Sequence, residues 1–122
     1  MRNFLYDVGV LKSYRSPVPV IAVGNLNTGG SGKTPMVEKL IDLYSGQYRM
    51  ILISRGYGRK TSGFIEVNVE DTPETCGDEP LQIKRKFSEI NVFVDENRRR
   101  AIEKSLQLYP KTNLIVLDDA FQ

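Results

Sequence analysis

The chain has 122 residues, enough for one domain with its own hydrophobic core. Hydrophobic residues make up 40% and charged residues 26%, as in an ordinary globular protein, and a net charge of +2 gives no argument for nucleic-acid binding. The single cysteine, Cys76, excludes an internal disulfide and fits a reducing compartment, and the absence of histidine excludes histidine chemistry by this chain's own side chains. No run predicts a membrane-spanning helix, and no signal peptide is expected.

Residues 1–12 have apolar side chains at helical spacing. These apolar residues are Phe4, Leu5, Val8 and Leu11. The basic residues nearby would suit an anionic membrane surface, but the favoured interpretation is a short helix packed on its own domain.

A buried strand is predicted over residues 20–23, and a glycine-rich loop and a helix over residues 34–44 follow it. The loop and the helix start contribute the candidate nucleotide-binding residues Asn27, Thr28, Gly29, Gly30, Ser31, Gly32, Lys33 and Thr34. Glycines let backbone N–H groups surround a phosphate, a lysine adds charge and a threonine hydroxyl can bind Mg²⁺. Asn27 departs from the strict P-loop pattern, which has glycine there. The alternative is a flexible glycine turn, but the strand–loop–helix setting favours phosphate binding.

A second buried strand is predicted over residues 49–53, and the basic loop 54–60 leaves its carboxyl end. Strand, helix and strand in this order make a right-handed parallel unit, so the basic loop and the P-loop leave the sheet from the same edge. The basic loop either contacts phosphate or is a solvated surface loop, and the residues alone do not decide between these two interpretations.

The next segment alternates apolar and polar residues over 64–70, which predicts a half-exposed strand at an edge or in a hairpin. Residues 71–76 are predicted to be a loop, with Cys76 a buried residue rather than a nucleophile. A helix is predicted to begin at residues 77–80. Asp78 is either its N-cap or, with Glu79, a carboxylate that activates a hydroxyl or holds Mg²⁺.

A strand is predicted over residues 90–94, a cap over 95–97 and a helix over 98–109. Arg98 would lie on the inward face at the helix N-terminus, where a cation opposes the macrodipole. A phosphate partner would compensate this, and the alternative is an ion pair with Asp95 or Glu96. The next two residues, Arg99 and Arg100, are predicted to be solvated.

The last predicted strand, residues 114–117, ends in Asp118 and Asp119. An apolar strand followed by aspartate is typical of a Walker B motif, in which Asp118 would bind Mg²⁺ and Asp119 would orient water, metal or substrate. Together these elements predict an α/β, P-loop NTPase-like three-layer sandwich with a mainly parallel sheet.

Five segments in this order, VGNLNTGGSGKTP, SRGYGRK, GDEP, ENRRRA and DDAFQ, resemble the tetraacyldisaccharide 4'-kinase family of lipid A biosynthesis. The resemblance implies transfer of the ATP γ-phosphate, with Mg²⁺, to the 4'-hydroxyl of an acylated glucosamine disaccharide 1-phosphate. It places the enzyme at the cytoplasmic face of the bacterial inner membrane. No nucleic-acid partner is expected, in line with the small net charge.

The resemblance also implies roles for single residues. Asp78 would be the catalytic base, and Lys33 would hold the β- and γ-phosphates. Thr34 and the Walker B pair, Asp118 and Asp119, would bind the metal. Contacts with substrate or phosphate are implied for Arg55, Tyr57, Glu79 and Arg98.

Members of this family are longer, with a second lobe and an N-terminal hydrophobic helix. Residues 1–122 are therefore expected to be the N-terminal portion of one P-loop kinase domain, soluble and incomplete for turnover by itself. A rival interpretation is a P-loop ATPase or nucleotide switch that does not act on lipid, although Thr28 stands where deviant Walker A proteins have their signature lysine. Two further interpretations are a kinase or ligase of soluble metabolites and a fragment without nucleotide affinity.

Overall fold

The computed structural model describes residues 17–23, 33–56 and 58–118, and of residues 33–36 the backbone alone. The elements in chain order are β1 (Val20–Val23), α2 (Lys33–Tyr44), β2 (Met50–Ser54), β3 (Ile65–Glu66), α3 (Pro73–Cys76), α4 (Asp78–Lys86), β4 (Asn91–Val94), α5 (Arg98–Leu108) and β5 (Leu114–Asp118). The helix predicted over residues 1–12 lies outside the described residues.

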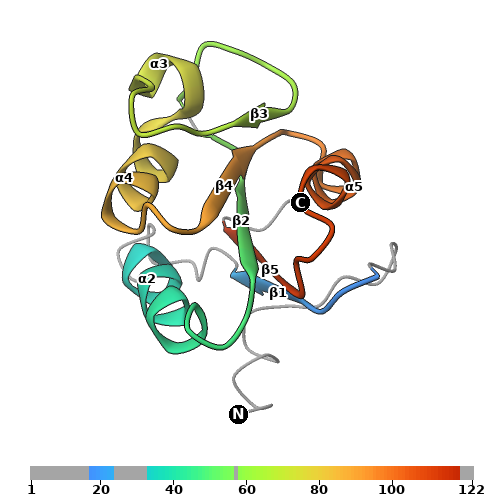
Figure 1. Ribbon diagram of the computed structural model, residues 1–122. Coiled ribbons are helices and arrows are strands. Elements are labelled where there is room, and N and C mark those ends of the chain that lie inside the picture. Colours follow the sequence, from blue (N-terminus) through green and yellow to red (C-terminus); the bar gives the residue numbers. More distant parts are fainter. Residues whose placement is uncertain (1–16, 24–32, 57, 119–122) are drawn as a thin grey trace.

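One sheet runs through the domain in the strand order β1-β5-β2-β4-β3 (Figure 1). Every pairing among β1, β5, β2 and β4 is parallel, and β3 pairs antiparallel with β4 at the edge. Parallel strands must be joined by a connection that returns to the starting end of the sheet, and helices provide these connections here. The predicted α/β fold with a mainly parallel sheet is confirmed.

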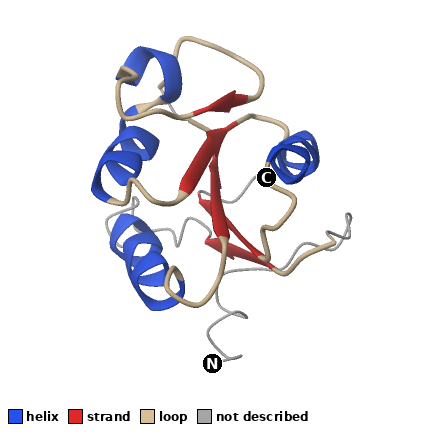
Figure 2. Cartoon of the chain, viewed as in Figure 1, coloured by secondary structure: helices blue, strands red, loops and turns tan. Residues whose placement is uncertain are grey.

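Helices cover both faces of this sheet, with α2 and α4 on one face and α5 on the other (Figure 2). Successive side chains of a strand therefore pack on opposite faces of the sheet. Leu52 of β2 packs toward Leu40 and Ile83, whereas its neighbours Ile51 and Ile53 belong to the cluster around α5. Burial on both faces explains why the strands are almost continuously apolar instead of alternating with polar residues.

The segment between β2 and α4 differs from its prediction in two places. The strand predicted over 64–70 is limited to β3, because the chain turns where the Asn68 N–H donates to Asp71 Oδ2 (2.8 Å) and the Asp71 N–H donates to the Asn68 carbonyl (3.0 Å). The predicted loop 71–76 contains α3, which has Pro73 in its first turn, a position that proline favours. Cys76 is fully buried, as predicted. Its burial, and to a smaller extent the negative charge of Asp71, raises the pKa of the thiol.

In the parts of the chain that the structure describes, no helix combines the length and the apolar character needed to cross a membrane.

Candidate phosphate-binding site

The carboxyl ends of the parallel strands form one row across the sheet. Val23 of β1 is in register with Asp118 of β5, Asp118 with Ser54 of β2, and Ser54 with Val94 of β4. Ligands of open α/β sheets bind outside the carboxyl ends of the strands. The segments that leave this row are therefore the candidates for a binding site.

The glycine-rich residues 27–32 lie outside the described residues, but the elements on both sides of them are described. β1 ends at Val23, and Lys33 and Thr34 are the first two residues of α2. The predicted strand and the predicted helix are thus present on the two sides of this segment. The first turn of α2 has N–H groups with no acceptor inside the helix and carries the positive end of the helix dipole, and both favour an anion.

Asp118 is the last residue of β5 and is 1% exposed. Its pairing with Val23 puts it beside the strand that leads into the glycine-rich segment. This is the placement that the Walker B interpretation requires, and metal binding by Asp118 stays a prediction. Asp119 lies outside the described residues.

Arg55 follows Ser54 directly and is half-buried at the same edge. The next residue, Gly56, has φ +73° and is fully enclosed, because a methyl group in place of its hydrogen would come within 3.0 Å of the Cys76 carbonyl oxygen. Only glycine fits this position without strain. The close contact brings the Arg55 segment next to the residues that precede α4, and Tyr57 lies outside the described residues.

Asp78 and Glu79 are the first two residues of α4, and both are exposed. The interpretation of Asp78 as an N-cap is wrong, because Gly77, with φ +93°, occupies that position. Asp78 Oδ2 instead accepts a hydrogen bond from Gln82 Nε2 one turn on (3.1 Å). Since the Cys76 carbonyl lies next to Gly56, the start of α4 lies beside the loop that carries Arg55.

Arg98 is the first residue of α5 and is half-buried. The predicted cap is present, because Asn97 Oδ1 accepts a hydrogen bond from the Arg100 N–H (3.0 Å). The interpretation in which Arg98 pairs with Asp95 or Glu96 is wrong. Arg100, the third residue of α5, makes these contacts, because its side chain extends toward the residues that precede the helix. Among the described residues, no acidic side chain pairs with Arg98.

Arg100 is therefore not the solvated residue that was predicted. Its Nε donates to Asp95 Oδ2 (2.9 Å), its Nη2 donates to Asp95 Oδ1 (2.5 Å), and Asp95 is fully buried. Arg99, by contrast, pairs with Glu103 at the surface (3.4 Å). A bidentate arginine gives a buried carboxylate the charge and the hydrogen bonds that it needs.

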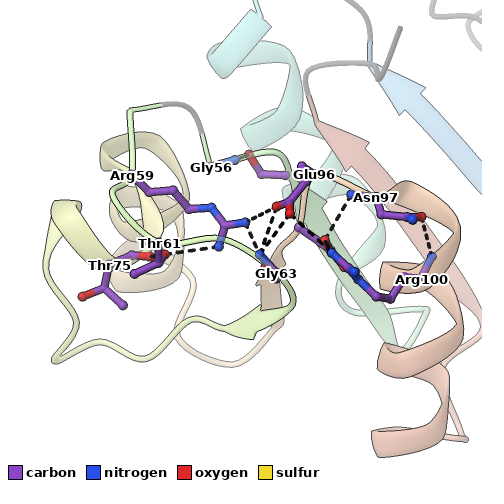
Figure 3. A network of polar contacts seen from close by, with 10 residues as sticks. Gly56, Arg59, Thr61, Gly63, Thr75, Glu96, Asn97 and Arg100 are labelled. Carbon is purple, nitrogen blue, oxygen red and sulfur yellow. Dashed lines mark hydrogen bonds and ion pairs between the residues drawn. The ribbon is translucent and has the colours of Figure 1, made fainter.

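A polar network that the sequence did not predict connects the basic loop to the start of α5 (Figure 3). Arg59, in the loop after β2, donates from Nη2 to Glu96 Oε1 (2.6 Å) and to the Gly63 carbonyl (2.8 Å). Its side chain is 4% exposed. Arg59 thus fits neither interpretation of the basic loop, because it is neither solvated nor free for phosphate. Its partner lies 37 positions away, so no local pattern could have found it.

The Asp95–Arg100 pair makes a prediction about acid stability. Burial works to raise the pKa of Asp95, but the hydrogen bonds from Arg100 and the Asn97 N–H hold this pKa below its ordinary value. A carboxyl group with a lower pKa in the folded state stabilises the protein above its unfolded pKa of about 4 and loses this stabilisation as the pH falls further. We expect Asp95→Asn to lower the free energy of unfolding by about 1.5–3 kcal/mol at pH 7, and by less at pH 3.

Urea unfolding at both pH values measures this difference, with Glu103→Gln as the matched control in an exposed pair. An equal loss at pH 7 and pH 3 would contradict the assignment.

A pocket of about 460 Å³ lies at the opposite edge of the sheet, where β2 and β4 begin and α5 ends. Met50, Asn91 and Tyr109 line it. It contains none of the predicted site residues, and it belongs to the amino-terminal edge rather than the edge where ligands of this fold bind.

Comparison with known proteins gives a consistent result. The family model described as "LpxK: Tetraacyldisaccharide-1-P 4'-kinase" matches residues 1–122. A tetraacyldisaccharide 4'-kinase of Flavobacterium psychrophilum is 53% identical over 122 residues, which are 100% of this chain and 36% of the relative. The tetraacyldisaccharide 4'-kinase of Parabacteroides distasonis is 50% identical over 123 residues, 99% of this chain and 33% of the relative.

A solved structure is also similar. The "apo" form of LpxK from Aquifex aeolicus, crystallised in complex with ATP, superposes on this chain with a TM-score of 0.81 and is 41% identical to it in sequence. The superposition covers 99% of this chain and 39% of the Aquifex aeolicus chain. The chain thus spans about a third of the length of the curated relatives that it matches.

Proposed function

Because the chain belongs to the tetraacyldisaccharide-1-P 4'-kinase family, we propose that the protein transfers the γ-phosphate of ATP to the 4'-hydroxyl of an acylated glucosamine disaccharide 1-phosphate. The observation that carries this proposal is the register of Asp118 with Val23, at the strand end where the glycine-rich segment begins. Phosphoryl transfer asks a protein mainly for positioning and charge compensation, and this edge of the sheet supplies residues for both.

Mg²⁺ fits the donors at this edge. Thr34 and Asp118 would hold it, with Asp119 as a second carboxylate, and hydroxyl and carboxylate oxygens are the ligands that Mg²⁺ prefers. The described residues contain no group of three or more side chains able to hold a metal ion. This is compatible with Mg²⁺, which is usually held by one or two carboxylates and the substrate phosphates. When bound, Mg²⁺ compensates charge on the β- and γ-phosphates.

The chain's own side chains have distinct tasks in this proposal. Asp78 accepts the proton of the acceptor hydroxyl as that oxygen bonds to the γ-phosphorus and the bond from this phosphorus to the leaving ADP breaks. Lys33 and the N–H groups of the glycine-rich segment hold the β- and γ-phosphates. Arg55 and Arg98, with Tyr57 and Glu79, contact substrate or phosphate.

The acceptor carries acyl chains, which partition into a membrane. The protein therefore works at the surface that presents this lipid, which we propose is the cytoplasmic face of the bacterial inner membrane. Domain organisation follows the same proposal, with residues 1–122 as the N-terminal portion of the kinase.

The test is phosphoryl transfer by the full-length protein from ATP labelled in its γ-phosphate. We expect Mg²⁺-dependent labelling of the tetraacyldisaccharide 1-phosphate, and no labelling of an acceptor whose 4'-hydroxyl is blocked. Hydrolysis of ATP without labelled lipid would overturn the proposal and favour a nucleotide switch.

Lys33→Ala is expected to weaken ATP binding by about tenfold to a hundredfold, since a charged hydrogen bond contributes about 1.5–3 kcal/mol. Calorimetric titration with Mg²⁺–ATP measures the change in Kd. Lys39→Ala removes the same charge from the exposed face of α2 and is the matched control. Equal affinities of the two variants would remove Lys33 from the nucleotide site.

A further inference from the structure

We propose that Glu96 is a positioning residue for the proposed phosphoryl transfer, on which this inference rests. Glu96 connects the loop that carries Arg55 to the helix start that carries Arg98, and so keeps two candidate phosphate-binding arginines in a fixed arrangement at the carboxyl edge of the sheet.

The carboxylate of Glu96 receives hydrogen bonds from both segments (Figure 3). From the loop after β2, Arg59 Nη2 lies 2.6 Å from Oε1, and the Gly63 N–H lies 3.1 Å from each carboxylate oxygen. From α5, Arg100 Nη2 lies 3.5 Å from Oε2. The hydrogen bond from the Gly63 N–H contributes most to a lowered pKa of Glu96, so this carboxylate stays ionised at neutral pH.

On the loop side, contacts between Arg59 and Gly56 connect Arg59 to the residue that follows Arg55. The Arg59 N–H donates to the Gly56 carbonyl (3.1 Å), and a methyl group on Gly56 would lie 2.9 Å from Arg59 Cδ. The Gly56 N–H in turn donates to Ser54 Oγ (3.2 Å), and Ser54 is in register with Asp118. A shift of the Arg59 side chain would therefore displace the residue next to Arg55.

On the helix side, Glu96 lies two residues before Arg98 and within the turn that Arg100 closes. The Asp95 N–H donates to the Ser54 carbonyl (3.0 Å), so this turn is attached to the same strand end. Both segments thus converge on Ser54. Glu96 is the side chain that joins their outer parts, because it contacts Arg59 of one and Arg100 of the other.

Arg59 depends on this carboxylate. Its side chain is 4% exposed, and a guanidinium in such a place needs an anionic partner. Without Glu96, its remaining acceptors among the described residues are the neutral Gly63 carbonyl (2.8 Å) and Thr61 Oγ1 (3.3 Å). We therefore expect Arg59 to turn toward solvent when Glu96 is removed, and the Arg55 segment to move with it.

The experiment is a mutant cycle in the full-length protein. Glu96→Ala is expected to lower kcat/KM for the lipid acceptor by about tenfold to a hundredfold, because small misplacements of binding groups have effects of this size. The KM for ATP should change by less than about twofold, since none of the contacts of this network among the described residues involves β1. Glu96→Gln keeps an acceptor oxygen and should recover part of the loss.

The dependence of the Glu96→Ala effect on Arg55 and Arg98 distinguishes a positioning role from a general loss of protein stability. In a background with both Arg55→Ala and Arg98→Ala, Glu96→Ala should lower kcat/KM by less than about twofold, because its effect passes through these arginines. The same fold loss in both backgrounds would overturn the proposal. Glu103→Ala removes the exposed partner of Arg99 and is the control that should leave kcat/KM unchanged.

Amide hydrogen exchange tests the contact without using activity. In Glu96→Ala, exchange at Gly63 and in the rest of the loop 58–63 should rise, while β2 and β4 keep their protection. Unchanged exchange at Gly63 would overturn the proposal. Absence of phosphoryl transfer in the unsubstituted protein would reject the proposed function and, with it, the positioning role for that reaction.

Discussion

Asp118→Asn is expected to reduce phosphoryl transfer by the full-length protein by about a hundredfold to a thousandfold, since a bound metal ion contributes several kcal/mol of transition-state stabilisation. The substitution keeps the shape of the side chain but removes its charge. Asp118 is buried at the end of β5, beside the strand end that leads into the glycine-rich segment. In the proposed function, Mg²⁺ and the phosphate groups occupy this same edge, where the carboxylate of Asp118 would bind the metal.

The measurement is the Mg²⁺ concentration that gives half-maximal transfer, together with ATP affinity in the absence of Mg²⁺. We expect Asp118→Asn to raise the Mg²⁺ requirement and to leave metal-free ATP binding nearly unchanged. Asp95→Asn is the matched control, because Asp95 is equally buried, follows β4 two places from β5 in the same parallel sheet, and binds Arg100. If both variants needed the same Mg²⁺ concentration as the unsubstituted protein, Asp118 would not be a metal ligand.

The central strands were predicted well, because burial on both faces of a parallel sheet leaves a continuous apolar run in the sequence. Residues 50–54 and 114–118 are completely buried strands, and their apolar runs show it in the sequence. By contrast, α3 is a single turn, and β3 has two residues. Elements this short are decided by local hydrogen bonds, such as those between Asn68 and Asp71, which carry little periodic signal.

The basic residues show what a single sequence cannot resolve. Arg59, Arg98 and Arg100 look equivalent along the chain, yet Arg59 is buried on Glu96 and Arg100 is bound to Asp95. The direction in which each side chain points follows from the helix start and from the tertiary contact between the loop and α5. The motifs located the edge of the sheet where the site is predicted, whereas the arrangement of charges around it depends on these distant contacts.

Asp78→Asn is expected to reduce the rate of the chemical step by about a hundredfold to ten-thousandfold while ATP affinity changes little, because general base catalysis contributes about this much. Asp78 is exposed in the first turn of α4, and an asparagine there can still accept the hydrogen bond from Gln82. The loss of its charge near the helix N-terminus affects stability by only about 0.3–1 kcal/mol. Folding and nucleotide binding should therefore persist, and a lost rate would reflect the proton transfer itself.

Single-turnover kinetics with saturating ATP and lipid acceptor isolate that step from binding and product release. Glu74→Gln is the matched control, since Glu74 is an exposed acidic residue in the first turn of the neighbouring α3 and should leave the rate within about twofold of the unsubstituted protein. A near-normal rate in Asp78→Asn would remove Asp78 as the base. The proton would then have to pass to another group, and Glu79, the second carboxylate in the same helical turn, would be the next residue to replace.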